Sequence, residues 1–381
     1  MNMKTNTQKT RALIRLAALL ALLTINSQLS IYAQGSLTPP GAPAPTMKRL
    51  DQIEPRKPIS TAPFTISANG AYYLTGNLTV ASGDAITIAA NNVTLDLCGF
   101  TISSTAPGGS GNAILFSGAR TNVAICNGHI TGNVVNNSGV YSGSGFGYGI
   151  FYSGTTAPVN VRVSGVCVAR CLNDGISIGD FDSTLVESCN ARTVGGYGIV
   201  AGIVRNCVAV DCGSGGISCL QAYDTQGQGI GVGIYALLNA QNCYGYGNIS
   251  AGYGILCYGN LQNCYGQSSS GEGIHVAGVA QNCYGLNSGD ANYGLFAGIA
   301  QNCYAESSAS DGIHATQVAT GCVGLNDTGG GFDGVYSGYL AVGCYGYSAA
   351  GTGLGAFMAN ACGGDTSTGT KFAVTHNVNS F

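Results

Sequence analysis

The chain contains no Trp, only four Met and nine Pro, and few charged residues: 14 Lys or Arg and 17 Asp or Glu among 381. This charged fraction of 8% is about a third of the usual share, which excludes a surface made of solvated helices. The scarcity of Pro, with no Gly-X-Y period, excludes collagen, and the 45% of hydrophobic residues argue against disorder. Glycine is abundant, with 61 residues, and indicates short elements joined by many turns.

Basic residues are missing from a large part of the chain. Between Asn206 and Thr370 there is no Lys or Arg, against nine acidic residues. Nucleic acid is excluded as a partner, because binding it requires a basic surface that neutralises phosphates. An acidic polysaccharide would be repelled as well unless Ca²⁺ bridged it. We expect no cofactor, with Ca²⁺ as the exception if it bridges such a ligand.

The first 33 residues predict a Sec signal peptide. Four basic residues precede the apolar residues 16–25, and Ala33 offers a small residue for cleavage. The apolar run is too short to span a bilayer comfortably, and no second long run follows. We therefore expect a soluble, secreted protein, extracellular or periplasmic, with no transmembrane segment after cleavage and with 10 basic and 17 acidic residues.

Residues 34–63 predict an extended linker, because seven of the nine prolines fall between Pro39 and Pro63. Within the linker, Thr46 can cap a short helix that ends at Pro55 and covers the first turn of the following domain. The apolar side of this helix would consist of Met47, Leu50 and Ile53.

Residues from Phe64 onward predict half-buried strands, since apolar and polar residues alternate in stretches such as 85–97. The string Gln-Asn-Cys-Tyr recurs at Gln241, Gln262, Gln281 and Gln301. Cysteines of this series are 18 to 22 residues apart, except for one gap of 36 that corresponds to two repeats with one marker lost. A period near 20 residues with no helical stretch predicts a parallel β-helix.

The order of residues within a repeat predicts which side chains face inward. Gln, two positions before Cys, must face water, so strict alternation would place the cysteine outside as well. A one-residue corner at the intervening Asn, in the left-handed conformation, resolves this conflict and lets successive Asn amides hydrogen-bond. The predicted register is Ala in, Gln out, Asn at the corner, Cys in, Tyr out and Gly in.

The chain resembles the bacterial exported right-handed parallel β-helix repeat proteins of the pectate-lyase superfamily, in residues 41–56, 70–77 and 92–100 and in the repeats. The resemblance covers about residues 41–376 and implies a right-handed coil and an asparagine corner ladder. Four residues depart from that ladder: Ser188, Gly321, Gly343 and Ala361. We expect an all-β fold, a single right-handed parallel β-helix (solenoid) of roughly a dozen coils over residues 64–381 with a short N-terminal capping segment. The superfamily includes lyases, glycosidases and binding proteins, so it implies little about activity.

Sixteen cysteines in an exported protein would suggest disulfides by compartment. Their regular inward spacing instead predicts a mostly reduced apolar stack, because the Cβ vectors on neighbouring turns are poorly directed for bonding. No metal site is expected, since the close pairs Cys167/Cys171 and Cys207/Cys212 lack a second matched pair or a nearby His.

Two groups of residues are weak candidates for catalysis. The motif from Asp311 to His314, together with Asp333, places two carboxylates on adjacent coils about 5 Å apart, which suits a retaining glycosidase pair or a shared cation. The alternative interpretation is an ordinary corner Asp that bonds backbone. The second group would supply the acids and the Arg of a lyase-like site: Asp174, Asp180, Asp182 and Arg192. A surface ion pair between Glu187 and Arg205 is the alternative interpretation of that stretch.

The outward tyrosines that follow the cysteines form a row of candidate binding residues: Tyr244, Tyr265, Tyr284 and Tyr304. They could stack on sugar rings, or they could pack on one another and stabilise the solenoid, and the lack of Trp disfavours a dedicated sugar platform. We therefore expect a structural or recognition protein, at the cell surface or outside the cell, that contacts polysaccharide or a surface glycan. Sparse charge argues against an enzyme, and the alternative is a polysaccharide lyase or glycoside hydrolase acting in a groove along the β-helix.

Overall fold

The computed structural model describes Ala17 and residues 54–248, 252–289, 292–328 and 330–380. The chain divides into two compact units, Met1–Pro55 and Arg56–Phe381, and nearly all described residues belong to the second. Apart from Ala17, the predicted signal peptide lies outside the described residues. The same holds for the predicted capping helix as far as residue 53.

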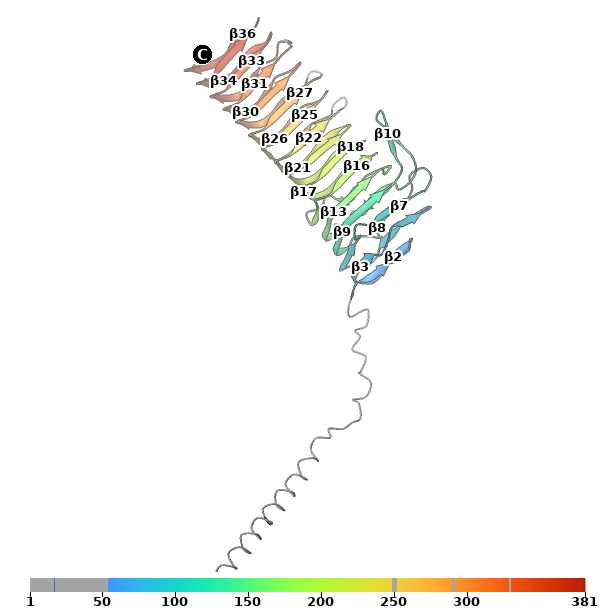
Figure 1. Ribbon diagram of the computed structural model, residues 1–381. Helices are drawn as coiled ribbons and strands as arrows, with labels where there is room; N and C mark the ends of the chain where they lie inside the picture. The colour runs from blue at the N-terminus through green and yellow to red at the C-terminus, as the bar shows by residue number, and fades with distance from the viewer. Residues whose placement is uncertain (1–16, 18–53, 249–251, 290–291, 329, 381) are drawn as a thin grey trace, which may run out of the picture. The chain divides into compact units, whose positions relative to one another are not determined.

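The second unit is a parallel β-solenoid of about 15 turns, which confirms the predicted all-β fold with a few more turns than the dozen expected (Figure 1). No helix occurs among the described residues from Glu54 to Ser380. The first strand, β1, begins at Lys57 and pairs in parallel with β3.

The strands stack in three columns along the solenoid, and the longer strands pass around a corner and belong to two columns. The first column contains β1 (Lys57–Ile59), β3 (Gly70–Leu74), β6 (Val93–Asp96), β9 (Thr121–Thr131), β13 (Val159–Ala169), β15 (Thr184–Glu187), β17 (Tyr197–Arg205), β19 (Gly215–Tyr223), β21 (Val232–Gln241), β24 (Asn260–Gln262), β26 (Ile274–Gln281), β28 (Leu295–Gln301), β30 (Ile313–Thr320), β32 (Val335–Val342), β34 (Thr352–Asn360) and β36 (Thr370–Val378). The second contains β2 (Phe64–Ile66), β5 (Ile86–Ile88), β8 (Asn112–Phe116), β12 (Tyr148–Phe151), β14 (Ile176–Gly179) and β23 (Ile255–Cys257), and it continues through the N-terminal parts of β17, β19, β21, β26, β28, β30, β32, β34 and β36. The third contains β4 (Leu78–Val80), β7 (Thr101–Ser104), β16 (Asn190–Val194), β18 (Val208–Cys212), β20 (Gln226–Gly229), β22 (Tyr244–Gly247), β25 (Tyr265–Ser268), β27 (Tyr284–Asn287), β29 (Tyr304–Ser307), β31 (Val323–Asn326), β33 (Tyr345–Ser348) and β35 (Gly363–Thr366). A hairpin of β10 (Val135–Asn137) and β11 (Val140–Ser142) forms a separate antiparallel pair.

The core is a stack of aliphatic side chains, one from each turn in the same register. The column consists of Phe64, Ile86, Ile114, Ile150, Ile176, Ile199, Ile217, Ile234, Ile255, Ile274, Leu295, Ile313, Val335, Leu354 and Phe372. All members are fully buried except Phe64 and Phe372 at the two ends, which are half-buried. β-branched residues dominate because they suit an extended strand and fill the narrow interior.

A left-handed residue marks one corner of fourteen successive turns, as the order of the repeats predicted. The residues with positive φ at this corner are Cys98, Asn127, Gly165, Ser188, Asn206, Asp224, Asn242, Asn263, Asn282, Asn302, Gly321, Gly343, Ala361 and Asn379. In the turn of Asn242, Ala240 and Cys243 are buried, while Gln241 is half-buried and Tyr244 is exposed. The predicted inward and outward register is therefore confirmed, and Thr225, buried between Cys207 and Cys243, occupies the turn whose cysteine is missing.

Two columns of glycine let opposite walls of each turn approach closely. One column precedes the core aliphatic residues and the other follows the tyrosines. A Cβ added at Gly294 would lie 2.4 Å from the backbone oxygen of Glu306 and 2.7 Å from that of Gly312. A Cβ added at Gly285, in the facing column, would lie 2.2 Å from the backbone oxygen of Gly294. No side chain fits where the two walls meet in this turn, so glycine flattens the coil there.

Candidate functional site

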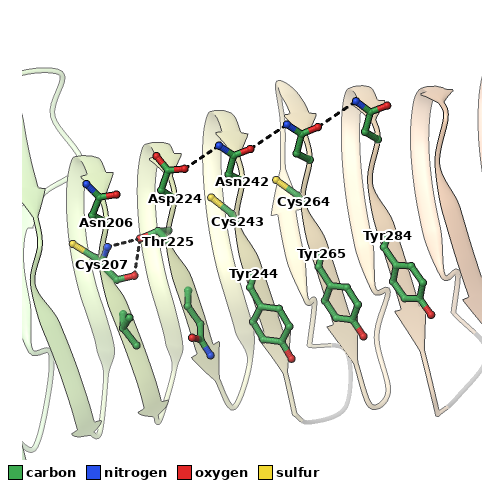
Figure 2. A pocket seen from close by; sticks show the side chains of 14 residues that line it. Asn206, Cys207, Asp224, Thr225, Asn242, Cys243, Tyr244, Cys264, Tyr265 and Tyr284 are labelled. Carbon is green, nitrogen blue, oxygen red and sulfur yellow. Dashed lines mark hydrogen bonds between the residues drawn. The ribbon is translucent and has the colours of Figure 1, made fainter.

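A shallow groove of about 750 Å³ runs along one edge of the solenoid and crosses five turns (Figure 2). Its lining residues are Asn206, Cys207, Val208, Asp224, Thr225, Gln226, Asn242, Cys243, Tyr244, Asn263, Cys264, Tyr265, Asn282 and Tyr284. Four of the turns supply a corner residue, an inward residue and an outward residue, and the fifth supplies only its corner and outward residues, Asn282 and Tyr284. Because the turns repeat about every 4.8 Å, the groove presents similar chemical groups at regular intervals.

One wall of the groove is a ladder of hydrogen-bonded amides. The side-chain amide of Asn242 donates to the Asp224 carboxylate at 2.9 Å, Asn263 donates to Asn242 at 3.1 Å, and Asn282 donates to Asn263 at 3.2 Å (Figure 2). Each amide has a second N–H and a further acceptor lone pair that the ladder does not use. The wall can therefore donate and accept hydrogen bonds toward a ligand in each turn that supplies an amide, whereas Asp224, the one carboxylate in the lining, only accepts.

The other wall is formed by stacked tyrosines. The ring centroids of Tyr244 and Tyr265 are 5.1 Å apart, those of Tyr265 and Tyr284 4.8 Å, and those of Tyr284 and Tyr304 5.0 Å. The planes of neighbouring rings differ by 18° or less. The hydroxyl groups of Tyr284 and Tyr304 both donate to one oxygen of Glu306, at 3.2 and 2.6 Å. Burial, reinforced by that carboxylate, raises the pKa of Tyr284 to about 12, so its phenol stays protonated at neutral pH.

The stacking determines which part of each tyrosine ring can contact a ligand. Tyr265 and Tyr284 each have a ring on both sides, so they present ring edges and hydroxyl groups to the groove and not their faces. Tyr244 is exposed to 38%, and its neighbour on the other side is Gln226, which has no ring. One face of Tyr244 is therefore the place within the groove where a sugar ring can stack, since Tyr304, which is followed by Val323 at the other end of the row, does not line the groove.

The floor beneath the groove is a column of thiols. All sixteen cysteines are free and thirteen of them are buried. From Cys243 onward the thiol of each cysteine that follows the corner residue donates weakly to the carbonyl two residues earlier, as from Cys283 to Gln281 at 3.2 Å. Hydrogen bonding to the thiol of Cys264, together with burial, raises the pKa of Cys283 to about 12. The predicted interior cysteine stack is confirmed. Hydrogen bonding to a neighbouring thiol, together with burial, raises the pKa of Cys264, Cys303 and Cys322 to about 12 as well, so these thiols are protonated at neutral pH.

Asp311, His314 and Asp333 form a compact cluster on another face. Asp311 and Asp333 occupy the same position on adjacent turns, as predicted. The backbone N–H of Asp333 donates to Oδ1 of Asp311 at 2.8 Å, and Oδ2 of Asp311 lies 2.8 Å from Nδ1 of His314. Asp311 is almost fully buried. Its two oxygens thus join two turns, which leaves His314 Nε2 as the nitrogen not engaged by this carboxylate.

Asp333 has an unusual proton affinity. Burial, with the negative charge of Asp311 added, raises the pKa of Asp333 to about 6. A carboxyl group whose pKa is higher in the folded than in the unfolded state destabilises the fold when it ionises. The stability of the solenoid is therefore expected to fall as the pH rises from about 4 to about 6.

Replacing Asp333 by Asn is expected to remove this penalty. At pH 7 the D333N variant should gain about 1 kcal/mol of unfolding free energy, less than the full shift implies because solvent reaches part of the side chain. At pH 4 the gain should vanish. Urea unfolding at both pH values measures the difference, with Asp327→Asn, an exposed aspartate, as the control. Loss of stability at pH 7 would contradict the assignment.

A second carboxylate and imidazole pair lies two turns away. Nδ1 of His275 lies 2.6 Å from Oε2 of Glu272. The two imidazoles and Phe296 between them form a stack with Tyr336, at centroid distances of 4.6, 5.4 and 4.6 Å. The repeated motif of acid, Gly, Ile and His thus builds an aromatic row on this face.

The charged residues between Arg162 and Arg205 are divided among several turns. Asp174 precedes β14 and accepts the backbone N–H of Tyr197 at 2.8 Å, and burial raises the pKa of its carboxyl group. Asp180 and Asp182 are exposed residues that follow β14, whereas Arg192 is an exposed residue of β16.

The ion pairing of this stretch differs from the one expected. Glu187 and Arg205 are register partners on adjacent turns, as predicted. Glu187 forms its ion pair with Arg162 instead, a residue on the preceding turn. Arg205 lies over the ring of Tyr223, 5.3 Å from its centroid.

Sequence reasoning missed a polar cluster around Asp211. Its carboxylate accepts hydrogen bonds from Asn136 at 2.7 Å, Tyr141 at 2.9 Å and Thr193 at 2.7 Å. Burial opposes ionisation, but these hydrogen bonds lower the pKa of Asp211 below its usual value. The cluster attaches the β10–β11 hairpin to the solenoid, and the 70 or more residues between the partners explain why local patterns did not reveal it.

Within the described part of the chain, no group of three or more His, Cys, Asp or Glu is arranged to hold a metal ion. Among the same residues, no helix is long and apolar enough to cross a membrane.

Comparisons with known proteins give no support for a particular function of this groove. No protein-family model and no curated protein matches the chain. A solved structure described as Geobacillus virus E2 ORF18 aligns with 15% identity and a TM-score of 0.18. The alignment covers 81% of this chain and 53% of that one, so the chain spans about half the length of the protein it matches. A TM-score this low supports no conclusion about fold or function.

Proposed function

We propose that the solenoid binds a neutral, extended polysaccharide along the groove between the amide ladder and the tyrosine ladder. The observation that supports this proposal most is the repetition of a polar corner side chain over five turns, four of them amides, beside tyrosines in three successive turns. A turn advances by about 4.8 Å, comparable with one pyranose unit in an extended chain. A polymer aligned with the solenoid axis would therefore meet an amide, and in successive turns a phenol, at each sugar.

The charge of the groove favours a neutral ligand. Its lining contains one carboxylate, Asp224, and no basic residue. A polyuronate chain would place a negative charge on every unit against this wall, with no cation among the lining residues to compensate. A hydroxyl-rich neutral polymer matches amides and phenols that both donate and accept hydrogen bonds.

We infer further that the protein is exported, and that it acts as a recognition or structural element at the cell surface or outside the cell. The basic and apolar leader in residues 1–33 supports export. The motifs in residues 70–77 and 92–100 support a place among the right-handed β-helices of the pectate-lyase superfamily. Both inferences are independent of the groove.

Binding is tested with the protein from Gln34 onward and a panel of neutral and acidic polysaccharides, with and without Ca²⁺. We expect affinity for at least one neutral polymer and none for polygalacturonate. The Y244A variant should bind about tenfold more weakly, because it removes the open ring face and one end of the ladder.

The matched control is Tyr345→Ala. Tyr345 belongs to the same outward row and is exposed to 42%, but it does not line the groove. Equal loss of affinity in both variants, or retention of acidic polymers alone, would contradict the proposal. Shortened products in the same incubations would instead favour the alternative function, a lyase or glycoside hydrolase, and would direct mutagenesis to Asp311, His314 and Asp333.

A further inference from the structure

Three of the sixteen thiols differ from the interior stack. Cys98 and Cys167 are exposed and Cys126 is half-buried, whereas the other thirteen are buried. The buried thiols are shielded by the walls of the coil, and hydrogen bonding to neighbouring thiols, together with burial, raises the pKa of Cys264, Cys283, Cys303 and Cys322 to about 12. Reaction with a soluble reagent is therefore confined to these three cysteines in the folded protein.

Cys98 is the corner residue of one turn, and Cys126 directly precedes Asn127, the corner residue of the next turn. Cys126 is the register partner of Asp96 in the pairing of β6 with β9. The chain turns directly after Asp96, where the backbone N–H of Cys98 donates to Oδ1 of Asp96 at 2.9 Å and Cys98 takes a φ of 52°. The backbone N–H of Leu97 donates to the carbonyl of Cys126 at 2.8 Å. Cys98 thus follows the donor of this hydrogen bond, Cys126 supplies its acceptor, and both cysteines lie beside the Asp96 carboxylate.

The charges around the two thiols show that they share one environment. Arg56 forms an ion pair of 3.0 Å with Asp96, so both charges lie beside the cysteines. Burial and then Asp96 raise the pKa of both thiols, while Arg56 acts in the opposite direction on both. The charge on Cys98 also raises the pKa of Cys126, as expected of two thiols within electrostatic reach. The cluster is not one that could hold a metal, since the described residues contain no such group of three ligands.

We propose that Cys98 and Cys126 are a redox pair that closes to a disulfide and joins two early turns of the solenoid. The oxidant is a small-molecule disulfide such as oxidised glutathione. The thiolate of Cys98, the more exposed partner, attacks one sulfur, which releases one thiol and leaves a mixed disulfide. The thiolate of Cys126 then attacks Cys98 Sγ and releases the second thiol. Two protons leave the protein, and the two electrons reduce the external disulfide.

Oxidised glutathione added to the folded protein tests the proposal directly. The thiols of Cys98 and Cys126 should both disappear from a titration without denaturant, and a non-reducing peptide map should contain Cys98 linked to Cys126. The rate should rise between pH 7 and pH 9, because both thiols have raised pKa values and only the thiolate reacts. Stable glutathione adducts on both cysteines with no link would overturn the proposal, as would a link from Cys126 to Cys167.

Single serine variants separate the roles of the three surface thiols. In C98S and C126S the remaining cysteine of the pair should carry a stable glutathione adduct and form no link. C167S, which removes the third surface thiol, should form the link at the wild-type rate. Binding to polysaccharide is measured on the same samples, so failure of the disulfide and failure of the groove proposal are read separately.

Discussion

Replacing Gly294 by Val is expected to lower the unfolding free energy by about 4 kcal/mol, and by Ala about half as much. The first added carbon already lies 2.4 Å from one backbone oxygen and 2.7 Å from another, distances that side-chain rearrangement cannot relieve. One of these oxygens belongs to Glu306 in the facing wall and the other to Gly312 in the next turn. Both walls must therefore move, and the parallel pairing of β28 with β30 is strained along with them.

The position of the damage distinguishes this prediction from general destabilisation. In a solenoid each turn contacts its neighbours, so a strained turn loosens nearby turns before distant ones. Amide exchange in β28 and β30 should accelerate more than exchange in β9 or β13, and the urea midpoint should fall. Gly76→Ala is the control, because a Cβ at Gly76 meets nothing within 4 Å. Uniform exchange across all turns would contradict the local mechanism.

Much of the fold could be predicted from the sequence, because each turn repeats the same pattern of buried, exposed and corner residues. The Gln-Asn-Cys-Tyr string predicted a left-handed corner, and Asn242, Asn263 and Asn282 have φ values between 52° and 55°. The 36-residue gap predicted a turn without its marker, and Thr225 fills it. Because the same pattern of apolar and polar residues recurs in many turns, an irregular residue in one turn does not obscure which positions are buried.

The candidate site was less predictable, because it depends on how neighbouring turns meet. The tyrosine row was visible as a spacing, but the sequence does not show that the rings stack face to face and leave one face of Tyr244 open. Asp224 replaces Asn in the corner ladder and escaped notice as a lining residue. The ion pair of Glu187 was assigned by register to Arg205, yet the long side chain of Arg162 reaches it from the preceding turn.

The second large effect is expected in the thiol column, where Cys283→Asp should lower the free energy of unfolding by at least about 4 kcal/mol at pH 7. The side chain of Cys283 lies between the thiols of Cys264 and Cys303, and the residue is almost fully buried. A carboxylate there would lose its hydration and find thiols that are poor hydrogen-bond donors. Cys283→Ala, which leaves only a small cavity, should cost about 1 to 2 kcal/mol.

The pH dependence gives this prediction a sign that a packing defect would not have. Burial would raise the pKa of the introduced carboxyl group far above its unfolded value, so the penalty grows as the pH rises from about 4. The C283D variant should recover most of its stability at pH 4, whereas the alanine variant should show no such recovery. Urea unfolding at pH 4 and pH 7 measures this, with the exposed Cys167→Asp as the control. A penalty that is independent of pH would mean that the introduced carboxylate reaches solvent, and that the thiol column is less closed than its burial indicates.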